Sequence, residues 1–116
     1  MTVTITEQNY QSVKKIDFDW ATTGTTGGTT INSYNGEVLR VLSYASATSG
    51  GTLTVADRDG YDILRGLGTF TSGESYLGTT DSRSPISAVA GSTLAFTVVN
   101  TTTTGGGAGH CIVYIR

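Results

Sequence analysis

The chain has 116 residues, a formal net charge of −2 and only 14% charged residues, a size that allows one domain with a single core. Its 7 Lys and Arg residues are scattered, which argues against nucleic acid as a partner because neutralising phosphates requires clustered basic side chains. No apolar stretch is as long as a membrane span and no signal-peptide pattern opens the chain, so a soluble protein is expected. A single cysteine, Cys111, excludes an intrachain disulfide framework and fits a reducing cytoplasm.

The first third of the chain predicts two strands. Residues 2–6 alternate threonine with apolar side chains and predict a first strand or extended arm within residues 1–12. Residues 15–20 alternate most clearly, with Ile16, Phe18 and Trp20 on one side and charged residues on the other. Successive side chains of a strand point to opposite faces, so this pattern predicts a sheet with one buried and one solvated face.

The next segments predict a loop and a hairpin. Residues 21–28 consist mainly of threonine and glycine and show no periodic pattern, which predicts a loop. Residues 29–34 and 37–44 flank Asn35-Gly36. Asn-Gly readily adopts the positive φ values of a two-residue turn, so the pair predicts a β-hairpin.

The second half predicts further short strands. Residues 52–56 lead through Asp57-Arg58-Asp59-Gly60 into residues 61–64, a second predicted hairpin, and residues 65–83 read as irregular. Pro85 lacks an N–H donor, which places the segment that follows at a sheet edge. Residues 93–99 form another strand, and residues 111–115 form a final strand that must be paired within a sheet, because unpaired terminal residues fray.

Together these elements predict an all-β fold. About seven or eight strands in one small domain are typical of a two-layer antiparallel β-sandwich of jelly-roll type. The expected organisation is an N-terminal arm or first strand over residues 1–12, followed by a β-sandwich domain over residues 13–116.

The sequence gives no catalytic apparatus. His110 and Cys111 resemble a base and a nucleophile, but neighbours on one strand point to opposite faces, so Cys111 is interpreted as a buried apolar residue. Asp17 and Asp19 could form a glycosidase pair, yet solvated residues occupy such a strand face equally well. The prediction is a protein without enzymatic activity.

Metal binding is also not predicted. Zinc sites need more Cys and His ligands than the chain offers. The segment beginning at Asp57 resembles the start of a calcium loop, but Gly68 stands where that loop needs a glutamate. An alternative hypothesis is a carbohydrate-binding module whose calcium is held by aspartates: Asp17, Asp19, Asp57, Asp59 and Asp62. Otherwise no cofactor and no metal are expected.

Several residues are candidates for contact with a partner protein. Trp20 continues an apolar strand face and belongs to the core, whereas Tyr34 beside a turn and Tyr76 in a long loop are expected to be exposed anchors. The N-terminal arm could pair with a neighbouring subunit by strand addition. The predicted interface residues are Thr2, Val3, Thr4, Ile5, Tyr10, Tyr34, Asn35 and Tyr76.

Taken in order, several segments resemble a known family. They read VKKIDFDW at 13–20, YNGEVLRV at 34–41, TLTV at 52–55, DRDGYDIL at 57–64, GSTLAFTV at 91–98 and IVYI at 112–115. This series is similar to the small β-sandwich virion proteins of tailed bacteriophages, some of which are capsid decoration or cement proteins.

The resemblance implies a jelly-roll on the outer surface of the capsid, made in the cytoplasm of a bacterial host. Such a protein would bridge neighbouring capsomers of the major capsid protein as a homo-oligomer, a dimer or a trimer. Binding the assembled lattice in preference to its dissociated parts would stabilise the shell. The alternatives are a phage tail, fibre or neck module and the carbohydrate-binding β-sandwich.

Overall fold

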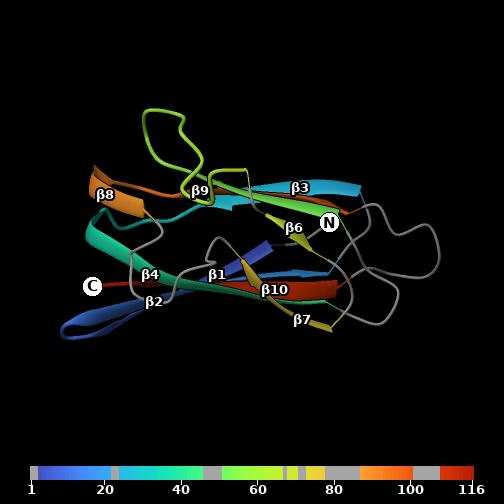
Figure 1. The fold of residues 1–116 in the computed structure, drawn as a ribbon, viewed down its shortest axis with the longest axis horizontal. Coiled ribbons are helices and arrows are strands. Elements are labelled where there is room, and N and C mark those ends of the chain that lie inside the picture. Colours follow the sequence, from blue (N-terminus) through green and yellow to red (C-terminus); the bar gives the residue numbers. More distant parts are fainter. Residues whose placement is uncertain are drawn as a thin grey trace.

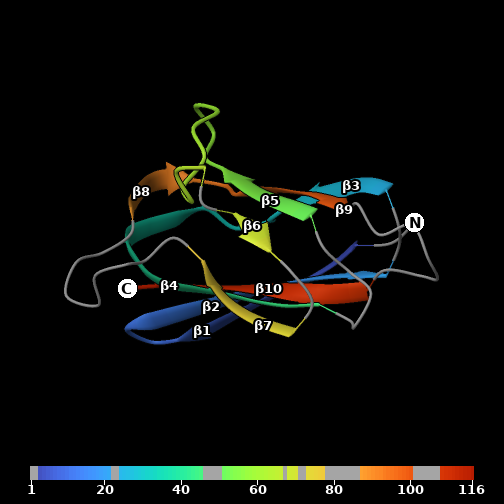
Figure 2. The ribbon, with the colours of Figure 1, turned by 45° about the vertical axis from the view of Figure 1, so that its right-hand side comes forward.

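The structure, a computed structural model, describes residues 3–21, 24–45, 51–66, 68–70, 73–77, 87–100 and 108–116. These residues form ten strands in two antiparallel sheets that pack face to face (Figures 1 and 2). The strands are β1 (Val3–Tyr10), β2 (Val13–Ala21), β3 (Gly24–Thr29), β4 (Tyr34–Ala45), β5 (Gly51–Ala56), β6 (Thr69–Phe70), β7 (Gly73–Leu77), β8 (Ser87–Ser92), β9 (Ala95–Asn100) and β10 (Ala108–Ile115). Among the described residues no helix has the length and hydropathy of a membrane span.

The strand pairs are nested along the chain as in a jelly roll. β2 pairs with β10, β3 with β9, β4 with β7 and β5 with β6, all antiparallel. One sheet has the order β1-β2-β10-β4-β7, with β8 joined to β4, and the other has the order β3-β9-β5-β6. A long hairpin rolled into two layers produces this order. The predicted all-β jelly-roll sandwich is therefore confirmed, with more strands than the seven or eight expected.

The core lies between the two sheets. Ile16, Phe18 and Trp20 point into it from β2 and are each at most 2% exposed, as the alternation predicts. The ring of Phe18 stacks on Phe96 of β9 with centroids 4.6 Å apart, and Trp20 meets Phe70 of β6 edge to face at 5.6 Å. Burying one such side chain contributes about 1.5–3 kcal/mol, so these rings fix one sheet against the other.

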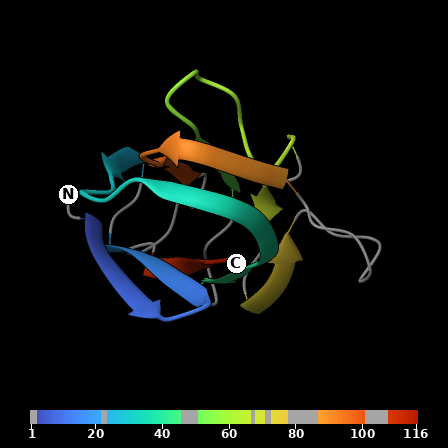
Figure 3. The ribbon, with the colours of Figure 1, turned by 90° about the vertical axis from the view of Figure 1, so that its left-hand side faces the viewer.

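The hairpin predicted at Asn35-Gly36 is wrong. Both residues lie within β4, where the pairing with β8 shifts register between Tyr34 and Gly36. Gly36 has a φ of +129°, so the positive φ serves a β-bulge and not a turn. Figure 3 shows β4 as a strongly curved strand, with β8 beside its first part.

Two loops predicted from composition contain strands. β3 falls in the threonine-glycine segment, whereas residues 30–33, part of a predicted strand, form a connection. A Cβ at Gly27 would collide with the backbone carbonyl of Phe96, so this strand needs glycine to approach β9. β6 and β7 lie in the range expected to be irregular. The predicted edge segment after Pro85 contains β8, and Pro85 itself lies outside the described residues.

The N-terminal arm is an integral strand of the larger sheet. β1 pairs with β2 over its whole length, from Val3 opposite Trp20 to Tyr10 opposite Val13. Val3 and Ile5 pack against the core. A two-residue turn at Gln11-Ser12, with φ of +63° at Gln11, joins the two strands.

The second predicted hairpin is present but short. The turn closes with Gly60 N–H donating to the Asp57 carbonyl at 3.0 Å, and beyond it only one bridge forms, between Ala56 and Asp62. The segment between β5 and β6 projects beyond the four-stranded sheet (Figure 2).

Candidate functional site

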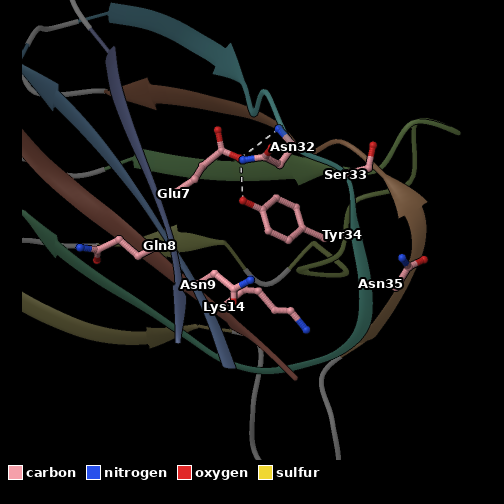
Figure 4. A pocket seen from close by; sticks show the side chains of 8 residues that line it. All are labelled: Glu7, Gln8, Asn9, Lys14, Asn32, Ser33, Tyr34 and Asn35. Carbon is pink, nitrogen blue, oxygen red and sulfur yellow. Dashed lines mark hydrogen bonds between the residues drawn. The ribbon is translucent and has the colours of Figure 1, made fainter. Parts of the chain in front are cut away.

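A polar cleft with a volume of about 360 Å³ lies between the β1–β2 hairpin and the start of β4 (Figure 4). It is lined by polar residues: Glu7, Gln8, Asn9, Lys14, Asn32, Ser33, Tyr34 and Asn35. Glu7 is its central charged group. Its carboxylate points towards the β3–β4 connection and not into open space (Figure 4).

Three donors hold that carboxylate. Oε2 of Glu7 accepts from the backbone N–H of Ile31 at 2.9 Å, and Oε1 accepts from the N–H of Asn32 at 3.1 Å. The hydroxyl of Tyr34 donates to Oε1 at 2.6 Å. These contacts join β1, an edge strand of the six-stranded sheet, to the connection between β3 and β4.

The protonation of both partners follows from this geometry. Burial alone would raise the pKa of Glu7, but the hydrogen bonds from Tyr34, Ile31 and Asn32 together lower it below its usual value of 4.5. Burial raises the pKa of Tyr34, and the hydrogen bond to the Glu7 carboxylate raises it further. At neutral pH Glu7 is therefore an anion and Tyr34 a donor. The pair acts as a structural clamp.

The prediction for Tyr34 is wrong, and the candidate residues did not include Glu7. Tyr34 was expected to be exposed, but it is only 6% exposed, because the bulge at Gly36 turns the start of β4 inward. Glu7 was not singled out. Val3, Ile5 and Glu7 share one side of a strand, and a charge that continues an apolar row is a signal of a buried partner.

A second polar cluster lies on the outer face of the six-stranded sheet. Asp17 and Asp19 of β2 and His110 of β10 have ligand atoms within 4.8 Å of one another, and His110 Nδ1 lies 3.8 Å from Asp19 Oδ1. Oδ1 of Asp17 is buried without a hydrogen-bond partner. Burial, and then the charge of Asp19, raise the pKa of Asp17. Within the described residues this set offers three side-chain ligands, fewer than a closed metal site uses.

The remaining aspartates belong to a different part of the molecule. Asp57 Oδ1 accepts from the N–H groups of Asp59 and Tyr61, each at 3.0 Å. Asp62 accepts from the N–H of Leu64 at 3.0 Å through Oδ1. Asp62 also accepts from Val55 through Oδ1 and from Gly66 through Oδ2. These carboxylates organise the loop between β5 and β6, so the hypothesis that five aspartates assemble one calcium site is wrong.

Cys111 is a core residue, as predicted. It is fully buried on the inner face of β10, and burial, followed by the negative charge of Asp17, raises the pKa of its thiol. His110, next to it in the chain, lies on the outer face beside Asp19. The two side chains therefore do not form a nucleophile–base pair.

The predicted interface residues are distributed over several surfaces. Val3 and Ile5 pack against the core, Thr4 is exposed on β1, and Tyr10 at the end of β1 is 58% exposed. Asn35 is exposed, with its Oδ1 accepting from the N–H of Gly91. Of the others, Tyr76 lies in β7, with nothing described of its side chain, and Thr2 lies outside the described residues.

Other exposed residues were not singled out as contacts. Ile31 is 89% exposed in the β3–β4 connection, and Tyr61 is 74% exposed at the projecting loop. Tyr44 of β4 is 49% exposed on the outer face of the six-stranded sheet. No family model matches the chain, and neither the curated proteins nor the solved structures include a match.

Proposed function

We propose that this chain is a non-enzymatic virion protein of a tailed bacteriophage, a capsid decoration protein that binds the major capsid protein on the outside of the shell. The observation that carries the proposal is the nested jelly-roll pairing of β2 to β10. It supports the architecture implied by the strand–turn–strand segments that resemble such proteins. In this proposal the sandwich is a rigid carrier and its loops and faces make the contacts.

The chemistry of the polar groups also supports a binding role. The carboxylate of Glu7 accepts hydrogen bonds from backbone and phenol donors, and the thiol of Cys111 is inside the core. The carboxylates of Asp57 and Asp62 hold a loop in place. Among the described residues, these three carboxylates and this thiol therefore have structural roles.

The projecting loop is the proposed contact with the capsid. Tyr61 is 74% exposed there, on a backbone restrained by the Asp57 and Asp62 hydrogen bonds. Arg58 N–H donates to Ser92 Oγ at 2.8 Å, which ties the loop to the end of β8. A large aromatic side chain held on a rigid loop loses little conformational entropy on binding, which makes it a suitable anchor.

The test is location and copy number in the virion. Virions of the phage that encodes the chain should carry it on the head, seen by immunogold electron microscopy, at hundreds of copies by quantitative gel densitometry. A dozen or fewer copies at the tail would favour the tail, fibre or neck alternative. Absence from purified particles would overturn the proposal.

The loop contact has its own test. Tyr61→Ala protein, added to capsids that lack the chain, should co-sediment at least about tenfold more weakly than wild type, as expected for loss of a central anchor. Tyr10→Ala is the matched control, since Tyr10 is also exposed but lies at the end of β1. Equal loss in both variants would contradict the placement of the contact.

A further inference from the structure

The outer face of the six-stranded sheet has a segregated pattern of side chains. Across β2, β10 and β4, the register places Asp19, His110 and Tyr44 in one row and Asp17, Ile112 and Leu42 in the next. Lys15, Tyr114 and Arg40 form the third row. The face therefore carries acidic side chains on β2 in the first two rows, apolar side chains on β10 and β4 in the middle row, and basic side chains in the third row.

Ring contacts hold the two charged ends in place. Tyr44 packs against the ring of His110 with centroids 5.8 Å apart, and His110 lies beside Asp19. The guanidinium of Arg40 sits 4.5 Å from the centroid of Tyr114. Both charged ends are thus presented on restrained side chains, which lowers the entropy cost of binding a partner.

This face also carries more apolar side chains than is usual for a sheet face that is turned to solvent. Val13, Leu39, Arg40 and Tyr114 surround a shallow depression of about 310 Å³. No described element covers this side of the sheet (Figures 1 and 2). An antiparallel sheet with one solvated face normally carries polar side chains on that face, so the apolar residues here indicate a surface that is covered in the assembled protein.

We propose that this face binds the same face of a second copy of the chain, giving a two-fold symmetric dimer. A two-fold axis that lies in the interface and crosses the strands at right angles reverses the order of the rows. When this axis runs midway between the second and third rows, those two rows face each other, with Asp17 opposite Lys15 and Ile112 opposite Tyr114. An axis parallel to the strands and running along β10 would instead place Lys15 opposite Arg40, two positive charges.

Self-complementary charge is what an interface between identical copies requires, because each residue must find its partner on the same surface. Asp17 and Lys15 point to the same face of β2, two positions apart, and supply one such pair of opposite charges. Two sheets stacked in this way lie about 10 Å apart, as in ordinary β-sandwiches.

The size of the face is sufficient. Five strands at about 4.8 Å and eight residues at about 3.4 Å give a footprint of roughly 24 by 27 Å on each copy. The two copies together would bury about 1,200 Å² or more, at the lower end of the range for stable interfaces. The inference goes beyond the capsid proposal and does not rest on it.

Charge-reversal variants test the inference by sedimentation velocity over roughly a hundredfold range of concentration. Wild type is expected to be a dimer. Asp17→Lys/Asp19→Lys and Lys15→Glu/Arg40→Glu should each raise the dimer dissociation constant at least about tenfold. Mixed one to one, the two variants should form a heterodimer, because each supplies the charge that the other needs. Asp59→Lys, which changes charge on the projecting loop, should dimerise like wild type.

A second measurement uses the wild-type chain and does not depend on the variants folding. An equal mixture of isotopically light and heavy chains, treated with a carbodiimide, should yield mixed-label peptides that join Asp17 to Lys15. A monomer at every concentration would overturn the inference. So would dimers that ignore the charge reversals, which would point to another surface such as the edge of β1.

Discussion

Tyr34 donates its hydroxyl to Glu7 at 2.6 Å, linking residues 27 positions apart in the chain. The same carboxylate accepts from two backbone N–H groups of the connection before β4. One glutamate thereby closes the side of the sandwich where β1 and β3 approach each other. Tyr34 is only 6% exposed, so its hydroxyl depends mainly on this acceptor.

Removal of Glu7 should therefore destabilise the fold. Glu7→Ala is expected to lower the free energy of unfolding by about 1–3 kcal/mol, the cost of leaving a buried donor unsatisfied. Tyr34→Phe should cost less, because it removes both the donor and its need for a partner. Urea denaturation of the two single variants and the double variant gives the coupling energy. Glu37→Ala, at an exposed position of β4, is the control and should change stability little.

The pH dependence of stability should have two opposing parts. Glu7 has a lowered pKa in the folded state, so it stabilises the fold above its unfolded pKa of about 4.5 and this stabilisation is lost as the pH falls through the folded pKa. Asp17 has a raised pKa, so ionising it as the pH rises above about 3.8 costs stability. Glu7→Gln should flatten the loss of stability in acid, and Asp17→Asn should make it steeper. Unfolding free energies measured from about pH 3 to about pH 7 check both signs; a Glu7→Gln profile as steep as wild type would contradict the clamp.

The sheet positions could be predicted where alternation was clear. The alternation of Ile16, Phe18 and Trp20 correctly predicted a buried face. The final apolar run correctly predicted a paired strand, which is β10 and lies between β2 and β4. The turn at Gln11 gave no signal, because it has neither glycine nor asparagine and depends on a glutamine with positive φ. Pairing along β1 and β2 dictates that conformation, and pairing is not a local property.

Asn35-Gly36 shows the limit of local reasoning most clearly. Of this pair only Gly36 has the expected positive φ, and a positive φ serves a bulge as well as a turn. The choice was decided by β8 and by Arg116, whose backbone exchanges hydrogen bonds with Glu37. The clamp at Glu7 was hidden for the same reason, since its partners lie far along the chain.

Substitutions at two glycines with positive φ distinguish the cost of backbone strain from the cost of steric crowding. At Gly36, with φ of +129°, a Cβ would collide with the carbonyl of Arg116, whereas at Gly91, with φ of +56°, it would meet open space. Gly91→Ala should cost about 1 kcal/mol from the left-handed backbone alone. Gly36→Ala should cost more, because the end of β10 must also shift. Urea denaturation of both variants measures the difference, and equal losses would show that crowding at the bulge has no effect.

The thiol of Cys111 should report on unfolding of the whole sandwich. It is fully buried, and its pKa is raised by burial, so the native thiol is both inaccessible and protonated, while reaction requires the thiolate. Its reaction with an aromatic disulfide reagent should therefore follow the rate or the population of the open state. In Tyr61→Cys protein, the added thiol at an exposed position should react at once and Cys111 slowly. Destabilising the clamp with Glu7→Ala should speed the slow phase in proportion to the lost free energy if opening is global. A slow phase unaffected by Glu7→Ala would mean that β10 opens locally, without separation of the two sheets.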